Sequence, residues 1–300
     1  MRPIRLLLIF FAVVFLGAAL IAPGVYQFVQ ILSARNDFFH SLSRQPFHRY
    51  VNRCLIFFAV IGLWPFFRAL GLKTWSDFGF APPATNWKKI PAGFFLGFGS
   101  LAVLATASLI FGVRQWQPMT INALFVSLFL TLLTAFAVAI LEEAIFRGAI
   151  FSAIRRTASW LIALAVSSAI YAIVHFFARP PPPETIKWFS GFVALGGMFR
   201  GFVDWPVLVP GFFNLLIVGA ILALAYQRTG DLYFSIGLHA GWIFSLKSYG
   251  ALTKKAHSAH LAFFGSFKIV DGWLATLVLS LVFILLFLFQ KKTKDVSDAR

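Results

Sequence analysis

Eight long apolar runs constrain the fold of this 300-residue chain more than any other feature. They cover residues 6–22, 54–70, 92–113, 121–154, 159–177, 212–226, 232–245 and 273–289. About 20 apolar residues in a helix cross the ~30 Å hydrocarbon layer of a bilayer. Backbone groups in lipid must be satisfied within the segment, which a helix achieves. We therefore expect an all-α fold, a polytopic transmembrane helical bundle of about eight spans.

The composition indicates the same class of protein. Hydrophobic residues make up 60% of the chain and charged residues only 12%, whereas a typical soluble domain has about 25% charged residues. The net charge of +16 is typical of basic loops that flank membrane spans. Nucleic-acid binding would need a basic soluble domain, and the sequence shows none. The single cysteine, Cys54, excludes an internal disulfide and a thiolate metal cluster.

The whole chain, residues 1–300, is expected to form a single integral membrane domain. Its first run follows Arg2 and Arg5, as in a signal peptide, but it is longer than a usual signal core, so we expect an uncleaved span. The sixth and seventh runs are short and closely spaced, which predicts a tight helical hairpin. Residues 179–211 contain four consecutive prolines and should form a loop or re-entrant insertion, and residues 290–300 a polar C-terminal tail.

Ionisable side chains inside the apolar runs are the main functional signal. Glu142, Glu143 and Arg147 lie in the fourth run, His175 in the fifth and His239 in the seventh. A charge near the bilayer centre costs about 2.5–3.5 kcal/mol on insertion scales, so such residues usually serve a function. At 1.5 Å per residue, Glu142 and His175 lie ~21 and ~28 Å from the turn near residue 156, which is a similar depth. We expect a polar catalytic cavity between helices of a motif-bearing core at residues 121–247.

The helical period places these ionisable side chains on different faces of their predicted helices. Glu143 and Arg147 are four residues apart and can neutralise each other, whereas Glu142 is rotated by ~100° and is free to face the interior. Two polar stripes at helical spacing contain the histidines: Ser168, Tyr171 and His175, and Ser235, His239 and Trp242. We expect the stripes to converge, although a single Ser or Tyr in a span is typical of a helix–helix hydrogen bond. The isolated Asn214 should be structural.

A buried carboxylate beside an imidazole can take a proton from water and direct the nucleophile at a carbonyl carbon. A second imidazole can donate a hydrogen bond to the developing oxyanion. The side chains of Glu142, His175 and His239 could equally form a His₂Glu metal site, and these residues leave both chemistries open. No H-E-x-x-H motif is present, no Asp lies in an apolar run, and Ser100, in a weak match to a nucleophile turn, has no evident base.

Three motifs resemble those of the CAAX protease and bacteriocin-processing (CPBP, Abi) family of intramembrane endopeptidases. EEAIFR, residues 142–147, is similar to the family signature E-E-x-x-F-R. SSAIYAIVH, residues 167–175, resembles the second motif, in which an aromatic residue precedes the histidine by four. RTGDLYFSIGLHAGW, residues 228–242, resembles the third. The family's eight-helix bundle also agrees with the number of apolar runs.

The resemblance implies a role for each matching residue. Glu142 would be the catalytic glutamate, His175 its partner in activating water, and His239 part of the oxyanion hole. The supporting residues would be Glu143, Arg147 and Tyr171. The chain departs from the family at Tyr171, where Phe is usual, and at Ile243, where many members carry Asn.

We therefore predict an intramembrane endopeptidase, a hydrolase of the glutamate type that uses water activated by Glu142 and His175. No cofactor is expected, and a divalent metal on Glu142, His175 and His239 is the alternative left open. The expected partners are membrane lipid and a peptide or lipidated-protein substrate, not nucleic acid, in a bacterial cytoplasmic membrane. Two other classes fit less well: a non-catalytic immunity or scaffold protein, favoured by Ile243, and a proton-coupled transporter, for which the repeats are not evident.

Overall fold

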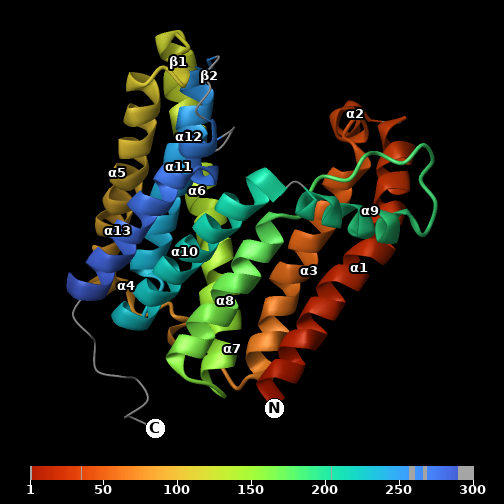
Figure 1. Cartoon of the computed structure of the whole chain (residues 1–300). Helices are drawn as coiled ribbons and strands as arrows, with labels where there is room; N and C mark the ends of the chain where they lie inside the picture. Colours follow the sequence, from red (N-terminus) through yellow and green to blue (C-terminus); the bar gives the residue numbers. More distant parts are fainter. Residues whose placement is uncertain (1, 35, 204, 257–260, 266–268, 290–300) are drawn as a thin grey trace. The chain divides into compact units, whose positions relative to one another are not determined.

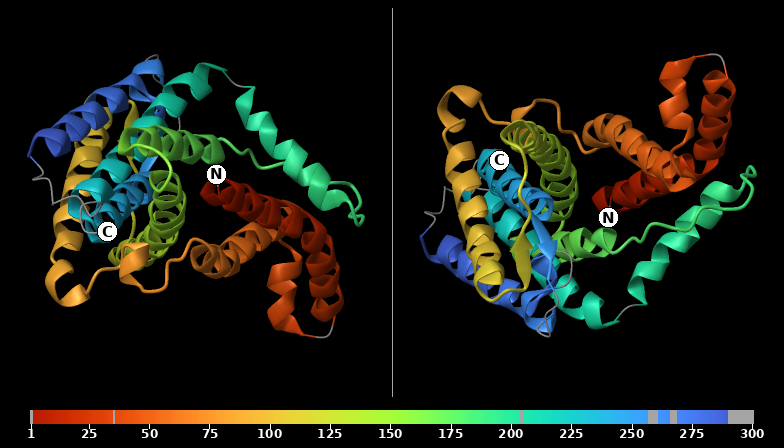
Figure 2. Two further views of the ribbon diagram at one scale, coloured as in Figure 1. Left: turned by 90° about the horizontal axis from the view of Figure 1, so that it is seen from below. Right: turned by 90° about the horizontal axis from the view of Figure 1, so that it is seen from above.

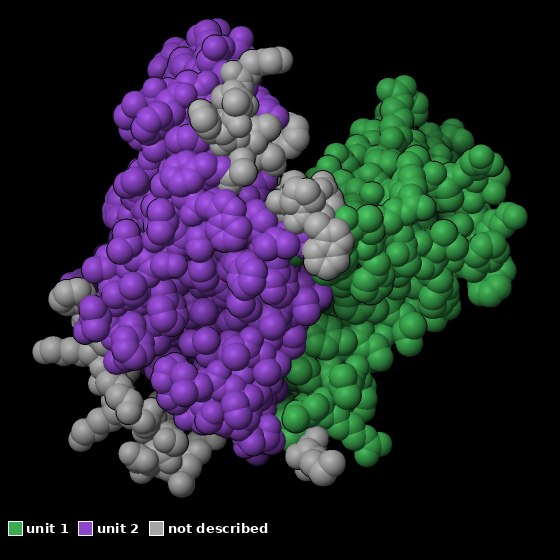
Figure 3. Space-filling model, in the orientation of Figure 1, with its two compact units in different colours: residues 1–72, 176–204 green, residues 73–175, 205–300 purple. Residues whose placement is uncertain are grey.

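The chain folds into two compact units (Figure 3). The computed structural model describes residues 2–34, 36–203, 205–256, 261–265 and 269–289. Unit 1 comprises residues 1–72 and 176–204, and unit 2 comprises residues 73–175 and 205–300. The expectation of a single integral domain stays a prediction. The predicted polar tail, residues 290–300, lies outside the described residues.

Unit 1 is a small helical assembly. Its elements are α1 (Arg2–Ser33), α2 (Asp37–Ser43), α3 (Phe47–Ala69), α9 (Ser190–Met198) and the short 3₁₀ helix η3 (Phe199–Phe202). Helix α1 packs against α3 and α9 (Figures 1 and 2). The contact with α9 is very close, because a Cβ on Gly191 would lie 1.9 Å from the carbonyl oxygen of Ala19. Cys54 packs in the core of this unit with Val51 and Met198, as a small apolar side chain does.

Unit 2 contains the larger helical bundle. Its helices are α4 (Pro83–Asn86), α5 (Lys89–Ile110), α6 (Ile121–Glu143), the π-helical segment η2 (Ala144–Phe151), α7 (Ser152–Arg155), α8 (Trp160–His175), α10 (Trp205–Thr229), α11 (Tyr233–Leu252), α12 (Leu261–Phe264) and α13 (Trp273–Phe289), with the 3₁₀ helices η1 (Ser76–Phe78) and η4 (Ile269–Asp271). Helix α11 packs against α5 and α6, and α10 packs against α8 and α13 (Figure 1). The strands β1 (Arg114–Trp116) and β2 (Thr253–Lys255) follow α5 and α11 and pair antiparallel, as Figure 2 shows.

The helices have the length and surface of a membrane bundle. Among the described residues, five helices are long and apolar enough to cross a membrane: Pro3–Ser33, Phe47–Ala69, Lys89–Ile110, Ile121–Arg155 and Leu208–Thr229. Helices α8 and α13 are apolar but shorter. Helix α6 leaves large apolar side chains such as Phe125, Phe129 and Leu133 exposed, as lipid contact requires. Each of the eight predicted runs lies on a helix, and the predicted all-α membrane bundle is confirmed.

Helices α10 and α11 form the predicted tight hairpin but are longer than the sequence indicates. Gly230, with φ +71°, follows the last residue of α10 and takes the left-handed conformation common after helix ends. Helix α10 begins at Trp205 rather than at residue 212, because the helix continues through Pro210. Helix α11 continues past residue 245 to Leu252, where its last turns bury Tyr249. The prediction that both helices are short is therefore wrong.

Residues 179–211, predicted as a proline-rich loop or re-entrant insertion, contain several helical segments. They include α9, η3 and the first residues of α10. Helix α9 has 9 residues, and at 1.5 Å per residue it extends only ~14 Å, about half of the hydrocarbon layer. Helix α9 is therefore too short to cross the hydrocarbon layer, and the loop or re-entrant position of residues 179–211 stays a prediction.

Glycines bring the backbones of α5 and α11 into direct contact. A Cβ on Gly93, Gly97, Gly237 or Gly241 would lie between 2.1 and 2.3 Å from a carbonyl oxygen of the facing helix. The glycines are four residues apart on each helix, which is the small-residue spacing of close helix packing in membranes. Because His239 lies between Gly237 and Gly241, this contact fixes the position of its backbone.

Candidate functional site

The two adjacent glutamates lie where α6 changes into a wider helical turn. Helix α6 ends at Glu143, and the π-helical segment η2 begins with the next residue and contains Arg147. The Ser152 hydroxyl donates to the carbonyl oxygen of Arg147 over 3.0 Å. π-Helical turns are rare and occur frequently at functional sites. The chain then turns between α7 and α8, near residue 156, where the helical spacing predicted the turn.

Glu143 and Arg147 form the predicted ion pair. Arg147 Nη1 lies 2.9 Å from Glu143 Oε1, and both side chains are at most 2% exposed. Arg147 Nη2 also donates to the carbonyl oxygen of Gly219 on α10 over 3.0 Å. The guanidinium therefore connects the π-helical segment to α10, which the sequence did not indicate.

His239 lies between the two carboxylates. Its Nδ1 is 2.9 Å from Glu143 Oε1, and its Nε2 is 3.7 Å from Glu142 Oε2. Sequence reasoning predicted the approach to Glu142 but missed the hydrogen bond to Glu143. Glu143 thus accepts from both Arg147 and His239, so this fully buried carboxylate has two hydrogen-bond partners, one of which is the charged guanidinium.

His175 reaches the same carboxylate from α8. Its Nε2 lies 3.8 Å from Glu142 Oε2, and its Nδ1 lies 2.7 Å from the carbonyl oxygen of Tyr171, one turn earlier. The structure therefore brings Glu142, His175 and His239 together from three helices, as the helical ruler predicted. This confirms the geometric prediction, while the catalytic roles stay predictions.

The hydrogen-bond partners assign the same tautomer to both imidazoles. The Nδ1 atom of His175 faces a carbonyl oxygen and that of His239 faces a carboxylate oxygen. Carbonyl and carboxylate oxygens only accept, so each Nδ1 must carry the proton. In the neutral rings, each Nε2 is then an acceptor directed at Glu142 Oε2.

The cluster is accessible on one side. The side chains of Glu142 and His175 are 24% and 30% exposed, whereas that of His239 is 5% exposed. Glu142 Oε2 itself is buried and lacks a protein hydrogen-bond partner among the described residues. The side chains of Glu142 and His175 are therefore partly exposed, whereas those of Glu143, Arg147 and His239 are buried.

Parts of the predicted polar stripes lie elsewhere. The Ser235 hydroxyl donates to the Leu232 carbonyl oxygen, and Trp242 Nε1 donates to the Ser100 hydroxyl on α5 over 2.9 Å. Ser100 is part of a regular helix, so it does not form a nucleophile turn. The prediction that the whole stripes converge is wrong for Ser235 and Trp242, because both polar groups are used in helix packing.

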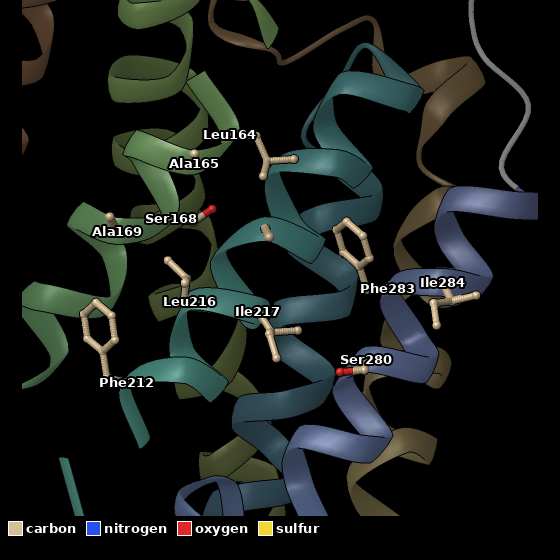
Figure 4. A pocket seen from close by; sticks show the side chains of 11 residues that line it. Leu164, Ala165, Ser168, Ala169, Phe212, Leu216, Ile217, Ser280, Phe283 and Ile284 are labelled. Carbon is tan, nitrogen blue, oxygen red and sulfur yellow. The ribbon is translucent and has the colours of Figure 1, made fainter. Parts of the chain in front are cut away.

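Ser168 also lies outside the cluster. With Ser280, it lines an apolar cavity of about 680 Å³ between α8, α10 and α13 (Figure 4). A Cβ on Gly219 of α10 would lie 2.9 Å from the Ser168 Cβ, so α8 and α10 are closely packed there. Asn214, expected to be structural, donates to the carbonyl oxygens of Val270 and Gly272. Its role in joining α10 to the segment before α13 confirms that expectation.

The spacing of the cluster bears on the metal alternative. Within the described parts of the chain, no three His, Cys, Asp or Glu side chains are placed to hold a metal ion together. Glu142 Oε2 lies 3.7 and 3.8 Å from the two Nε2 atoms, somewhat more than the roughly 3.4 Å that separates two donors of a tetrahedral zinc ion bound at about 2.0–2.2 Å. The donor types still suit a divalent metal, so the cofactor prediction stays open.

The fold and the cluster define a class of protein, a helical membrane protein with a glutamate–histidine site inside the bundle. Residues 122–245 match the family model described as type II CAAX prenyl endopeptidase, Rce1-like. This segment contains all six predicted site residues. The predicted resemblance to the CAAX protease family is therefore confirmed over this segment. No curated protein and no solved structure gives a significant match to the chain.

Two features of the site were not predicted. The first is the glycine contact between α5 and α11, which the spacing of Gly93 with Gly97 and of Gly237 with Gly241 could have revealed. The second is the carbonyl oxygen of Gly219 as a partner of Arg147. Every residue supplies such an acceptor, so no sequence signal indicates this contact.

Proposed function

We propose that the chain is an intramembrane endopeptidase that hydrolyses a peptide bond with water activated by Glu142 and His175. At the family level, the match to residues 122–245 supports a CAAX-type intramembrane protease. The observation that carries the finer proposal is the approach of two imidazole Nε2 atoms to one buried carboxylate oxygen, at 3.7 and 3.8 Å. These separations exceed a direct hydrogen bond and suit a bridging water.

The proposed reaction begins with a water molecule bonded to Glu142 and His175. Glu142 takes one proton as the water oxygen attacks the carbonyl carbon, and His175 Nε2 accepts the other hydrogen as a hydrogen bond. The carbonyl oxygen becomes an oxyanion. Glu142 then returns its proton to the amide nitrogen, the C–N bond breaks, and a carboxylic acid and an amine leave the site. The reaction consumes one water molecule, and all of its atoms end up in the two products.

The buried groups behind Glu142 support this chemistry electrostatically. The Arg147 guanidinium forms a buried ion pair with the Glu143 carboxylate. Arg147 and His239 compensate Glu143, which leaves Glu142 as the carboxylate available to act as the base.

The proposal also concerns substrate and location. The family description names prenyl endopeptidases, and apolar helices surround the site, so a membrane-anchored, lipidated or leader-type peptide suits it. Membrane lipid is the expected surrounding, and nucleic acid has no expected role. A bacterial cytoplasmic membrane is the proposed location of this multi-pass protein.

The test uses the purified protein in liposomes with a panel of leader and prenylated peptides. We expect the wild-type protein to cleave at least one peptide, and Glu142→Gln and His175→Ala to abolish or severely reduce cleavage. Glu184→Gln and His40→Ala are matched controls, because both residues belong to unit 1, whereas Glu142 and His175 belong to unit 2. Full cleavage by folded Glu142→Gln would overturn the proposal.

The same experiment separates the alternatives. Cleavage of no peptide, together with unchanged immunity conferred by Glu142→Gln, would favour the non-catalytic immunity or scaffold protein. Proton-coupled uptake that depends on Glu142 would favour the transporter.

A further inference from the structure

The polar groups that face Glu142 are mostly hydrogen-bond acceptors rather than donors. With both Nδ1 protons committed to Tyr171 O and Glu143 Oε1, the Nε2 atoms of neutral His175 and His239 are acceptors. The oxygens of ionised Glu142 are acceptors as well. A tetrahedral intermediate needs the opposite, a donor directed at its oxyanion. His239 can supply that donor only as an imidazolium, with protons on both nitrogens.

The hydroxyl group in contact with these acceptors belongs to Tyr171. Its oxygen lies 3.4 Å from His239 Nε2, and because Nε2 accepts, the tyrosine O–H donates. The side chain is buried, at 2% exposure. Unlike the histidines, Tyr171 can redirect its donor by rotating a single C–O bond, with no change in protonation.

The ring of Tyr171 is held from several sides. Its centroid lies 5.0 Å from that of Phe146 and 4.3 Å from that of His175, and the Arg147 guanidinium carbon lies 5.0 Å from it. These neighbours fix the ring, so the hydroxyl occupies a set position. Because the ring is held in place, the only rearrangement needed when charge develops is rotation of the O–H, which keeps the reorganisation small.

Other nearby groups are less suited to the oxyanion. The two terminal nitrogens of Arg147 already donate to Glu143 and to the Gly219 carbonyl oxygen. Backbone N–H groups inside the helices are bonded within those helices. Ile243, one turn after His239, presents only an apolar side chain, which packs with Ala240 and its neighbours.

We propose that the Tyr171 hydroxyl is a catalytic residue that donates a hydrogen bond to the oxyanion. This inference rests on the proposed hydrolysis and adds to it a donor that is present without an imidazolium. In the resting site the O–H donates to His239 Nε2. When the substrate carbonyl is attacked, the O–H turns to the oxyanion, and no covalent bond of Tyr171 forms or breaks.

The test is Tyr171→Phe, which removes only the hydroxyl and keeps the ring and its packing. We expect kcat to fall about 10²–10³-fold, the loss seen when one oxyanion donor is removed, while KM changes little. A tetrahedral phosphinate analogue of the cleaved peptide should lose affinity for Tyr171→Phe, whereas uncleaved substrate should bind Glu142→Gln and the Tyr171→Phe/Glu142→Gln double variant equally. If Tyr171 were purely structural, Tyr171→Phe would change the affinities for the phosphinate analogue and for the uncleaved substrate alike.

Tyr226→Phe is the matched control, because Tyr226 is a partly buried tyrosine of unit 2 and its hydroxyl contacts Ser152 over 3.4 Å. It should retain wild-type kcat. Wild-type kcat and analogue affinity in Tyr171→Phe, with Glu142→Gln inactive, would overturn this inference and leave the proposed function standing. Full activity of Glu142→Gln would instead refute the proposed function itself.

Discussion

Replacing Arg147 with Met should strongly destabilise unit 2. The guanidinium is 2% exposed and the Glu143 carboxylate is 0% exposed, so solvent cannot compensate the remaining charge. Breaking a buried ion pair by removing one partner costs about 3–5 kcal/mol, and the loss of the bond to Gly219 falls within the same network. We therefore expect Arg147→Met to lower the free energy of unfolding by about 3–5 kcal/mol.

The assay is reversible unfolding in detergent micelles, followed by circular dichroism. The Glu143→Gln/Arg147→Met double variant should recover part of the loss, because it removes the unpaired charge along with its partner. Lys88→Met, on an exposed lysine, should stay within about 0.5 kcal/mol of wild type. If the free energy of unfolding of Arg147→Met lay within about 1 kcal/mol of the wild-type value, the inference that Arg147 forms a buried ion pair with Glu143 would be refuted.

Three further predictions follow from the same contacts. Glu143→Gln removes the charged acceptor of the His239 Nδ1 proton, so peptide cleavage should fall about 10–100-fold, as for other groups that orient an imidazole; unchanged kcat would contradict this. Gly97→Ala places a Cβ 2.2 Å from the Leu238 carbonyl oxygen and should lower the free energy of unfolding by about 1–3 kcal/mol. In Gly99→Ala the new Cβ has no atom within 4 Å, so the free energy of unfolding should not change. Dialysis against a chelator should leave cleavage unchanged, and loss restored by Zn²⁺ would indicate the metal mechanism.

The general fold followed from the sequence because a bilayer restricts the possible structures. Apolar runs of sufficient length must be helices in lipid, and each of the eight runs lies on one. The ends of the helices were harder to predict. The sixth apolar run began at residue 212, yet α10 begins at Trp205 and includes Pro210, because membrane helices tolerate proline where neighbouring groups satisfy the freed backbone.

The site was predictable where it depended on spacing along one helix. The four-residue separation of Glu143 and Arg147 gave their ion pair, and the count from the turn gave the common depth of Glu142 and His175. The contact between Glu143 and His239 depends on how α11 is rotated against α6, which helical periodicity does not determine. Ser168 shows the same limit, because its stripe position agreed with Tyr171 but its hydroxyl lines a different cavity.

The most direct test of the account is a single turnover in isotope-labelled water, with the heavy oxygen followed by mass spectrometry. If Glu142 acts as a base, the label enters the new carboxyl group of the peptide product in the first turnover and none enters Glu142. Label in the Glu142 side chain with an unlabelled first product would show direct attack by the carboxylate. That result would contradict water activation by Glu142 and His175.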